Sequence, residues 1–144
     1  ILSEVVDISS TFRCEKGYPF RPFSELRLEE GKWQAYIYIS IDDRNDLHSA
    51  IPSTNLLTTT NINLLKELRD HCYFRCMNAD IATAQSRIYF VQNNSKVYSC
   101  NIVLDNSLQG LQTPNFGWIE PYSSSQFLHY CKQFHVPMWP IVVI

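Results

Sequence analysis

The sequence is poor in the residues and motifs on which several common functions depend. It has only four glycines among 144 residues, and it contains no glycine-rich phosphate loop, no G-x-S-x-G and no H-E-x-x-H. These motifs are the usual sequence signs of nucleotide binding, of serine hydrolases and of zinc peptidases. Three familiar kinds of catalytic site are therefore not expected in this chain, and no cofactor is expected either.

Charge is also scarce, and no long hydrophobic run occurs. Charged residues make up 18% of the chain, the formal net charge is −2 and the pI is about 6.1. Nucleic-acid-binding domains usually carry a clear basic excess, so we expect no general nucleic-acid binding. No apolar run approaches the ~20 residues of a membrane-spanning helix, so we expect no membrane span. A mildly acidic protein is best matched by a basic partner.

Cysteine is present, but not in the pattern of a disulfide framework. The chain has five cysteines, an odd number, and no C-x2-C pair. Disulfide scaffolds usually have an even count in a shorter chain. We therefore predict that Cys72, Cys76, Cys100 and Cys131 are buried and reduced. We also predict a cytoplasmic, reducing compartment, unless a signal peptide was removed before Ile1.

The length and the composition indicate one ordinary globular domain. Hydrophobic residues make up 45% of the chain and aromatic residues 13%. At this length about two-thirds of the unfolded surface is buried on folding, so the core needs no metal or disulfide to close it. We predict a single domain over residues 1–144, in which residues 1–31 form an N-terminal arm with an edge strand at residues 5–8.

The clearest element is a strand predicted over residues 33–41, where side chains alternate with a period of two. Tyr36 and Tyr38 are expected on the face away from the core. If helices cover only the other face, these tyrosines are partly exposed. The core-facing set is Trp33, Ala35, Ile37, Ile39 and Ile41.

The remaining patterns predict an α+β domain. Helices are expected at residues 62–77, capped by Thr60 or Asn61, and at residues 126–134, with a long loop over residues 47–60. Strands are expected at residues 87–92, 96–105, 115–120 and 141–144, the first two joined by a turn at residues 93–95. This order favours a single, largely antiparallel sheet with two main helices packed on one face.

Four side chains have the spacing of a chemical site. Cys72 and Cys76 are four residues apart, and Cys131 and His135 repeat that spacing. On helices each pair would share a face, and two thiolate-rich pairs would suit zinc or a thiol enzyme. The alternative is that these cysteines belong to apolar core stripes, which is the more common place for a free cysteine. We therefore expect no metal there. Cys14, beside Arg13 and Lys16, is the best candidate for a reactive thiol.

Two aromatic segments have the composition of recognition surfaces. One is the outer face of residues 33–41, with Tyr36 and Tyr38, and the other is the arm of residues 12–23, with Tyr18, Phe20 and Arg21. Tyrosine and arginine are enriched at binding hot spots. The alternative for the arm, which we favour, is that it folds over the domain with its rings in the core.

The function that best fits these features is a non-catalytic protein-binding domain of the inhibitor, immunity or adaptor kind, acting through an aromatic surface on a basic protein partner. The competing hypothesis is an enzyme with a zinc or thiol site built from Cys72, Cys76, Cys131 and His135.

Overall fold

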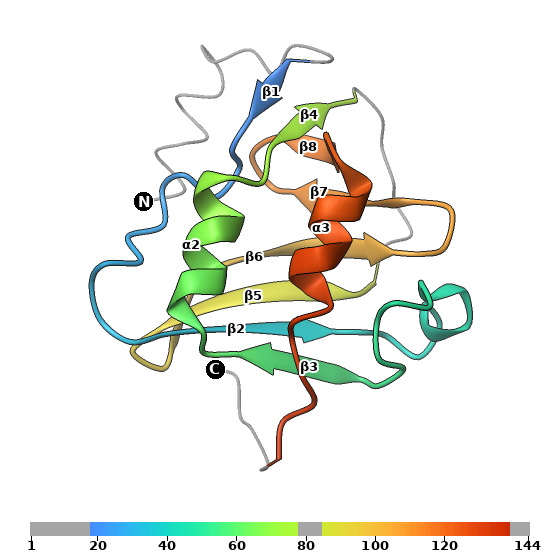
Figure 1. Ribbon diagram of the computed structural model, residues 1–144, viewed down its shortest axis with the longest axis horizontal. Helices are drawn as coiled ribbons and strands as arrows, with labels where there is room; N and C mark the ends of the chain where they lie inside the picture. The colour runs from blue at the N-terminus through green and yellow to red at the C-terminus, as the bar shows by residue number, and fades with distance from the viewer. Residues whose placement is uncertain (1–17, 78–84, 139–144) are drawn as a thin grey trace.

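The computed structural model describes residues 18–77 and 85–138, which form an α+β fold built on one antiparallel sheet. Helices α2 (Ile62–Asp70) and α3 (Ser124–Cys131) lie against one face of the sheet (Figure 1). The predicted fold class is confirmed. In their order across the sheet, the eight strands are β1 (Pro19–Phe20), β4 (Phe74–Cys76), β8 (Gly117–Pro121), β7 (Gln109–Thr113), β6 (Ser95–Leu104), β5 (Arg87–Gln92), β2 (Trp33–Tyr38) and β3 (Leu56–Thr59).

Strand β2 follows the alternating pattern of residues 33–41, but it ends at Tyr38. Ile37 is fully buried, and Ile39 keeps a core position just beyond the strand. The prediction for Ile41 is wrong, because this side chain is 74% exposed. The chain turns after the strand, where the backbone N–H of Asp43 donates to the carbonyl of Ser40 at 3.2 Å, and period-two alternation then no longer applies.

The prediction of a loop over residues 47–60 is wrong at its C-terminal end, where β3 pairs with β2. Thr58 lies opposite Tyr36, and Thr59 lies opposite Ala35. The hydroxyl of Thr58 also donates to the carbonyl of Ala35 at 3.1 Å. The polar composition of this stretch resembles a loop, but threonine is β-branched and is stabilised as a strand once a partner strand is beside it.

The first helix begins where the sequence predicts. The side chain of Asn61 accepts hydrogen bonds from the backbone N–H groups of Asn63 and Leu64, at 3.1 and 3.3 Å. Such a cap satisfies donors that have no partner inside the helix. Leu65 and Leu68 are buried on the face that packs toward the sheet.

The same helix ends much earlier than predicted, at Asp70 rather than residue 77. The chain then becomes β4, which pairs with β1 on one side and β8 on the other. Cys72 therefore lies just after the helix and Cys76 lies on a strand. A spacing of four residues places two side chains on one face only while the chain stays helical, so the two cysteines do not share a helix face.

Strands β5 and β6 form the hairpin predicted by the alternating sequence. Their turn has two central residues, Asn93 and Asn94, with positive φ values of 50° and 68°. Asparagine tolerates this conformation, which a tight hairpin turn requires at both positions. The turn also contacts the segment before β2, because Asn93 Oδ1 accepts the backbone N–H of Lys32 at 2.9 Å.

The strand β7 is absent from the sequence prediction, and β8 begins at Gly117 rather than at residue 115. Gly110 in β7 lies under the indole of Trp118, so closely that an added Cβ would lie 2.5 Å from the ring. Packing therefore requires a glycine at this position. Because β7 contains glycine and glutamine, residue propensities do not predict a strand here.

The second helix is displaced by two to three residues from the predicted range. It runs from Ser124 to Cys131, and the hydroxyl of Ser123 accepts the backbone N–H of Gln126 at 3.2 Å, which caps its first turn. Phe127 and Cys131 are buried against the sheet side. Helix ends vary in this way because capping and the last turn are set by local hydrogen bonds.

An aromatic cluster fills the core between the sheet and the helices. Phe23 lies at its centre, with ring centroids 4.8 Å from Phe90, 6.1 Å from Tyr98 and 6.4 Å from Phe74. Phe74 in turn packs against Phe127 of α3 at 5.3 Å. The end of the N-terminal arm therefore contributes a ring to the core, as the favoured alternative for this segment predicted. The strands predicted at residues 5–8 and 141–144 lie outside the described residues.

Candidate protein-binding surfaces

The two tyrosines of β2 lie on the sheet face away from the helices, but they differ in exposure. Tyr36 is only 5% exposed, and its hydroxyl donates to Gln34 Oε1 at 2.6 Å. Tyr38, two residues later, is 41% exposed. The expectation that both side chains are partly exposed is therefore wrong for Tyr36. Alternation predicts the face that a side chain points to, but not what covers that face.

The three predicted residues of the arm surround β1, at one edge of the sheet. Tyr18 precedes this strand and is 68% exposed. Phe20 is half-buried against Phe116, with ring centroids 4.9 Å apart. Arg21 follows the strand and forms an ion pair with Asp70 at 3.9 Å. Only the tyrosine therefore offers a largely free aromatic surface.

The sheet does not bring these two groups of predicted residues together. Five strands lie between β1 and β2 in the sheet. At about 4.8 Å per strand step, the two strands are roughly 30 Å apart. Tyr18 and Tyr38 therefore belong to different surfaces of the protein, and they do not form one compact binding hot spot.

Two further tyrosines, which no sequence pattern indicated, flank the strands β4 and β8 next to the edge strand β1. Tyr73 precedes β4, Tyr122 follows β8, and both are exposed. The backbone N–H of Tyr122 donates to the carbonyl of Tyr73 at 2.9 Å, so the strand pairing places these residues side by side. The guanidinium of Arg75 lies over the ring of Tyr122, 5.5 Å from its centroid. We call Tyr73, Arg75 and Tyr122 the tyrosine cluster. Tyr18 precedes Pro19, which pairs with Arg75 in an antiparallel register, so it lies near Cys76 at the other end of β4 and outside this cluster.

The loop of residues 21–32 runs from the tyrosine cluster to the start of β2, and Arg69 of α2 holds it. This guanidinium donates to the carbonyl of Leu26 at 2.9 Å and to both carboxylate oxygens of Glu29 at 2.9 and 2.7 Å. The hydrogen bonds from Arg69 lower the pKa of Glu29 to about 2, so the pair is ionised at neutral pH. The loop is thereby fixed against the helix.

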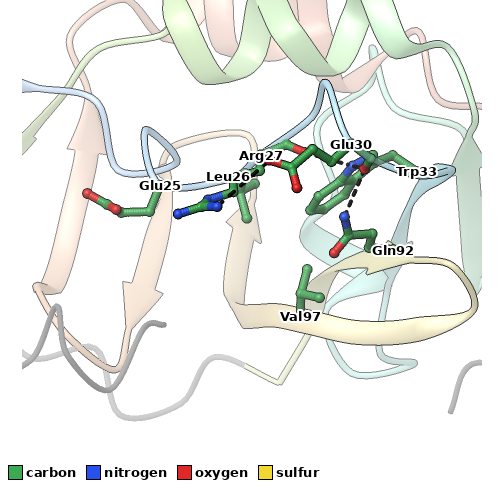
Figure 2. Close-up of a pocket in the computed structure, with 7 residues that line it drawn as sticks. All are labelled: Glu25, Leu26, Arg27, Glu30, Trp33, Gln92 and Val97. Atoms are coloured by element: carbon green, nitrogen blue, oxygen red, sulfur yellow. Dashed lines mark hydrogen bonds and ion pairs between the residues drawn. The ribbon is translucent and has the colours of Figure 1, made fainter.

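Figure 2 shows a pocket of about 200 Å³ between this loop and the β5–β6 hairpin. The indole of Trp33 forms part of its wall. The indole N–H is held by two backbone carbonyls, those of Arg27 at 3.1 Å and Glu30 at 2.7 Å. The side-chain amide of Gln92 donates to the same Glu30 carbonyl at 2.8 Å. The wall is therefore rigid, because its donors are already bonded.

The other residues around the pocket divide into an apolar group and an acidic group. Leu26 and Val97 add aliphatic surface beside the indole. Glu25 and Glu30 also line the pocket, and the guanidinium of Arg27 lies 3.8 Å from the carboxylate of Glu30. Sequence patterns did not predict this pocket, since its residues come from the loop, the start of β2 and both strands of the hairpin.

The four candidate metal ligands do not form a site. Cys72 and Cys131 are buried, whereas His135 is exposed and its backbone pairs with Thr58. Cys76 is disulfide-bonded. In the part of the chain that the structure describes, no group of three or more histidine, cysteine or acidic side chains is placed to hold a metal ion.

The disulfide at Cys76 corrects the prediction that this residue is reduced. An odd number of cysteines rules out complete pairing, but it does not rule out a single bond. Disulfides are uncommon in reducing compartments, so this bond weakens the compositional reason for a cytoplasmic location. Cys14, the candidate reactive thiol, lies outside the described residues.

The three free cysteines, Cys72, Cys100 and Cys131, should react slowly in the folded protein. Burial raises the pKa of the Cys72 and Cys100 thiols to about 12 and also raises that of Cys131. Because the thiolate is the reactive form, we expect alkylation at pH 8 to be on the order of a hundredfold or more slower than in denaturant. Mass spectrometry of the alkylated peptides would measure each site, and rapid labelling of Cys72 in native protein would contradict its burial.

Comparison of the chain with protein-family models, with curated proteins and with solved structures finds no match. Neither helix in residues 18–77 and 85–138 has the length and apolar character needed to cross a bilayer.

Proposed function

We propose that this chain is a non-catalytic protein-binding domain of the inhibitor, immunity or adaptor kind, and that it contacts its partner through the tyrosine cluster. The supporting observation is that two exposed tyrosines and an arginine come together on β4 and β8, the strands next to the edge strand β1. Tyrosine and arginine are the residue types that most often dominate binding energy. Tyrosine also offers a large contact area while losing little conformational entropy on binding.

The tyrosine cluster suits this role better than the tyrosines of β2. Tyr36 has almost no accessible surface, so of the two tyrosines on β2 a partner would reach only Tyr38. Tyr73 and Tyr122 are both exposed and lie side by side at paired ends of β4 and β8. A hot spot needs several contacts within one patch, and only neighbouring side chains can share a patch.

The strand pairing favours binding because it holds the cluster in place. Paired strands need little rearrangement on association, so less binding free energy is lost in ordering. The charges of the arginines are already engaged, since Arg75 lies over the Tyr122 ring and Arg21 pairs with Asp70. The electrostatic preference is then set by the net charge of −2, and we infer a basic partner whose affinity falls as salt rises.

The competing hypothesis of a thiol enzyme has less support from the described cysteines. Cys72, Cys100 and Cys131 are buried thiols with raised pKa values, and such thiols are poor nucleophiles at neutral pH.

Truncating the tyrosine cluster should weaken partner binding. The partner would first be identified by affinity capture from the native source and then purified. For Tyr73→Ala and Tyr122→Ala we expect at least one loss of about 2 kcal/mol or more, roughly thirtyfold in Kd. Isothermal titration calorimetry at two salt concentrations would measure each variant.

The matched control is Tyr38→Ala, which removes an exposed tyrosine near the opposite edge of the sheet. It should bind the partner like the unmodified protein. If both cluster variants also bind like the unmodified protein, the tyrosine cluster is rejected as the contact surface. Turnover of a substrate that is lost on cysteine or histidine substitution would favour the enzyme hypothesis instead.

A further inference from the structure

We propose that the pocket beside Trp33 receives an arginine side chain of the partner protein. The inference rests on the proposed protein-binding function and adds to it a second contact with a defined chemistry. Figure 2 shows the pocket between the loop of residues 21–32 and the β5–β6 hairpin, with Glu30 beside Trp33 and the Glu25 carboxylate pointing away from the indole.

The size of the pocket fits one side chain rather than a larger ligand. Its volume is about 200 Å³, whereas pockets for drug-sized molecules and cofactors typically hold roughly 300–1,000 Å³. A long side chain inserted from a partner surface is therefore a better match than a nucleotide or a similar cofactor.

The chemistry of the lining fits an amphipathic cation. Leu26, Trp33 and Val97 give an apolar wall, and the exposed carboxylate of Glu30 adds a negative charge, with the carboxylate of Glu25 farther from the indole. Lysine and arginine bury an aliphatic stem along apolar surface while the charged head stays near the opening. Arginine fits both parts, because its planar guanidinium pairs with carboxylates and also packs on aromatic rings.

The hydrogen-bond donors in the pocket wall do not use the side-chain carboxylates, which can therefore accept from an incoming guanidinium. The Trp33 indole N–H and the Gln92 amide both donate to backbone carbonyls, not to the rim. In the described part of the chain Glu30 has one ion-pair partner, Arg27, at 3.8 Å, and both of these side chains are largely exposed. An incoming guanidinium would therefore compete with Arg27 for the Glu30 carboxylate.

The test uses two small probes, N-acetyl-arginine amide and the uncharged N-acetyl-citrulline amide, which has nearly the same shape. Each would be titrated into labelled protein while the indole N–H resonance of Trp33 and the side-chain amide of Gln92 are followed by NMR. We expect saturable shifts at both groups with the arginine probe and much smaller shifts with citrulline. Equal shifts with the two probes, or none at tens of millimolar, would overturn the proposal.

Substitutions of the charged residues around the pocket should change the affinity for the arginine probe in opposite directions, depending on the sign of the charge removed. A purely structural role of these residues would not produce opposite directions. Glu25→Gln and Glu30→Gln should each weaken arginine binding by about two- to fivefold, the range of an exposed ion pair. Arg27→Gln should strengthen it, since the competing cation is removed. Glu67→Gln, an exposed glutamate of α2 that does not line this pocket, is the matched control and should change nothing.

Weaker binding by Arg27→Gln, or no effect of either glutamate substitution, would reject arginine as the occupant. Because the probes bind without the partner, failure here leaves the test of the tyrosine cluster unaffected.

Discussion

Replacement of Ile37 by alanine should lower the free energy of unfolding by about 2–5 kcal/mol. Ile37 has no accessible surface, and it lies between Leu57 of β3 and Ile88 of β5 in the sheet. The shorter side chain would leave a cavity in a closely packed core, since neighbouring strands can relax only in part. Urea denaturation, with the midpoint and the slope fitted for each variant, would measure the loss.

Tyr38→Ala is the matched control for this prediction, because Tyr38 is the next residue on the same strand but points to the opposite face. It is 41% exposed, so its truncation should change stability by less than about 1 kcal/mol. If Tyr38→Ala destabilises the protein strongly and Ile37→Ala does not, the register of β2 is wrong by one residue.

Replacement of Phe23 by alanine should cost about 3–5 kcal/mol of stability. This ring is 2% exposed and packs against Phe90, Phe74 and Tyr98. The loss would combine removal of a large apolar surface with loss of the edge-to-face and tilted ring contacts. Thermal and urea unfolding followed by far-UV circular dichroism would measure the change in stability.

The control for Phe23 is Phe20→Ala, three residues earlier in the same arm. Phe20 is only half-buried, with its ring against that of Phe116, so a clearly smaller loss is expected. An equal loss for the two variants would show that the arm does not depend on Phe23 as its anchor. Because Phe23 lies in the loop of residues 21–32, which lines the Trp33 pocket, Phe23→Ala should also reduce the Trp33 response to the arginine probe.

The parts of the fold that sequence patterns predicted correctly depend on short-range rules. Alternation over β2 placed Ile37 in the core, and Asn61 marked the start of α2. The paired asparagines marked the hairpin turn, where both residues adopt positive φ. In each case the determining contact lies within a few residues of the signal, so the pattern is visible in the chain itself.

The candidate site was predicted less completely, because a binding surface combines residues that are distant in the chain. Tyr18 was identified, but Tyr73 and Tyr122 were not, and these two come together only through the pairing of β4 and β8. Tyr36 has a suitable residue type and face, yet it is buried. The Trp33 pocket likewise depends on a loop, a strand start and a hairpin meeting in space.

The sequence by itself determined the α+β class, the core position of Ile37 on β2, the start of the first helix and the hairpin turn, since local periodicity and capping chemistry encode them. Only the tertiary structure decided that residues 56–59 pair as β3, that the first helix ends at Asp70, and that Cys76 is disulfide-bonded instead of sharing a helix face with Cys72. The physical reason is that strand pairing, burial and cross-linking depend on partners far away in the chain. A short segment with weak propensity adopts whichever structure those partners stabilise.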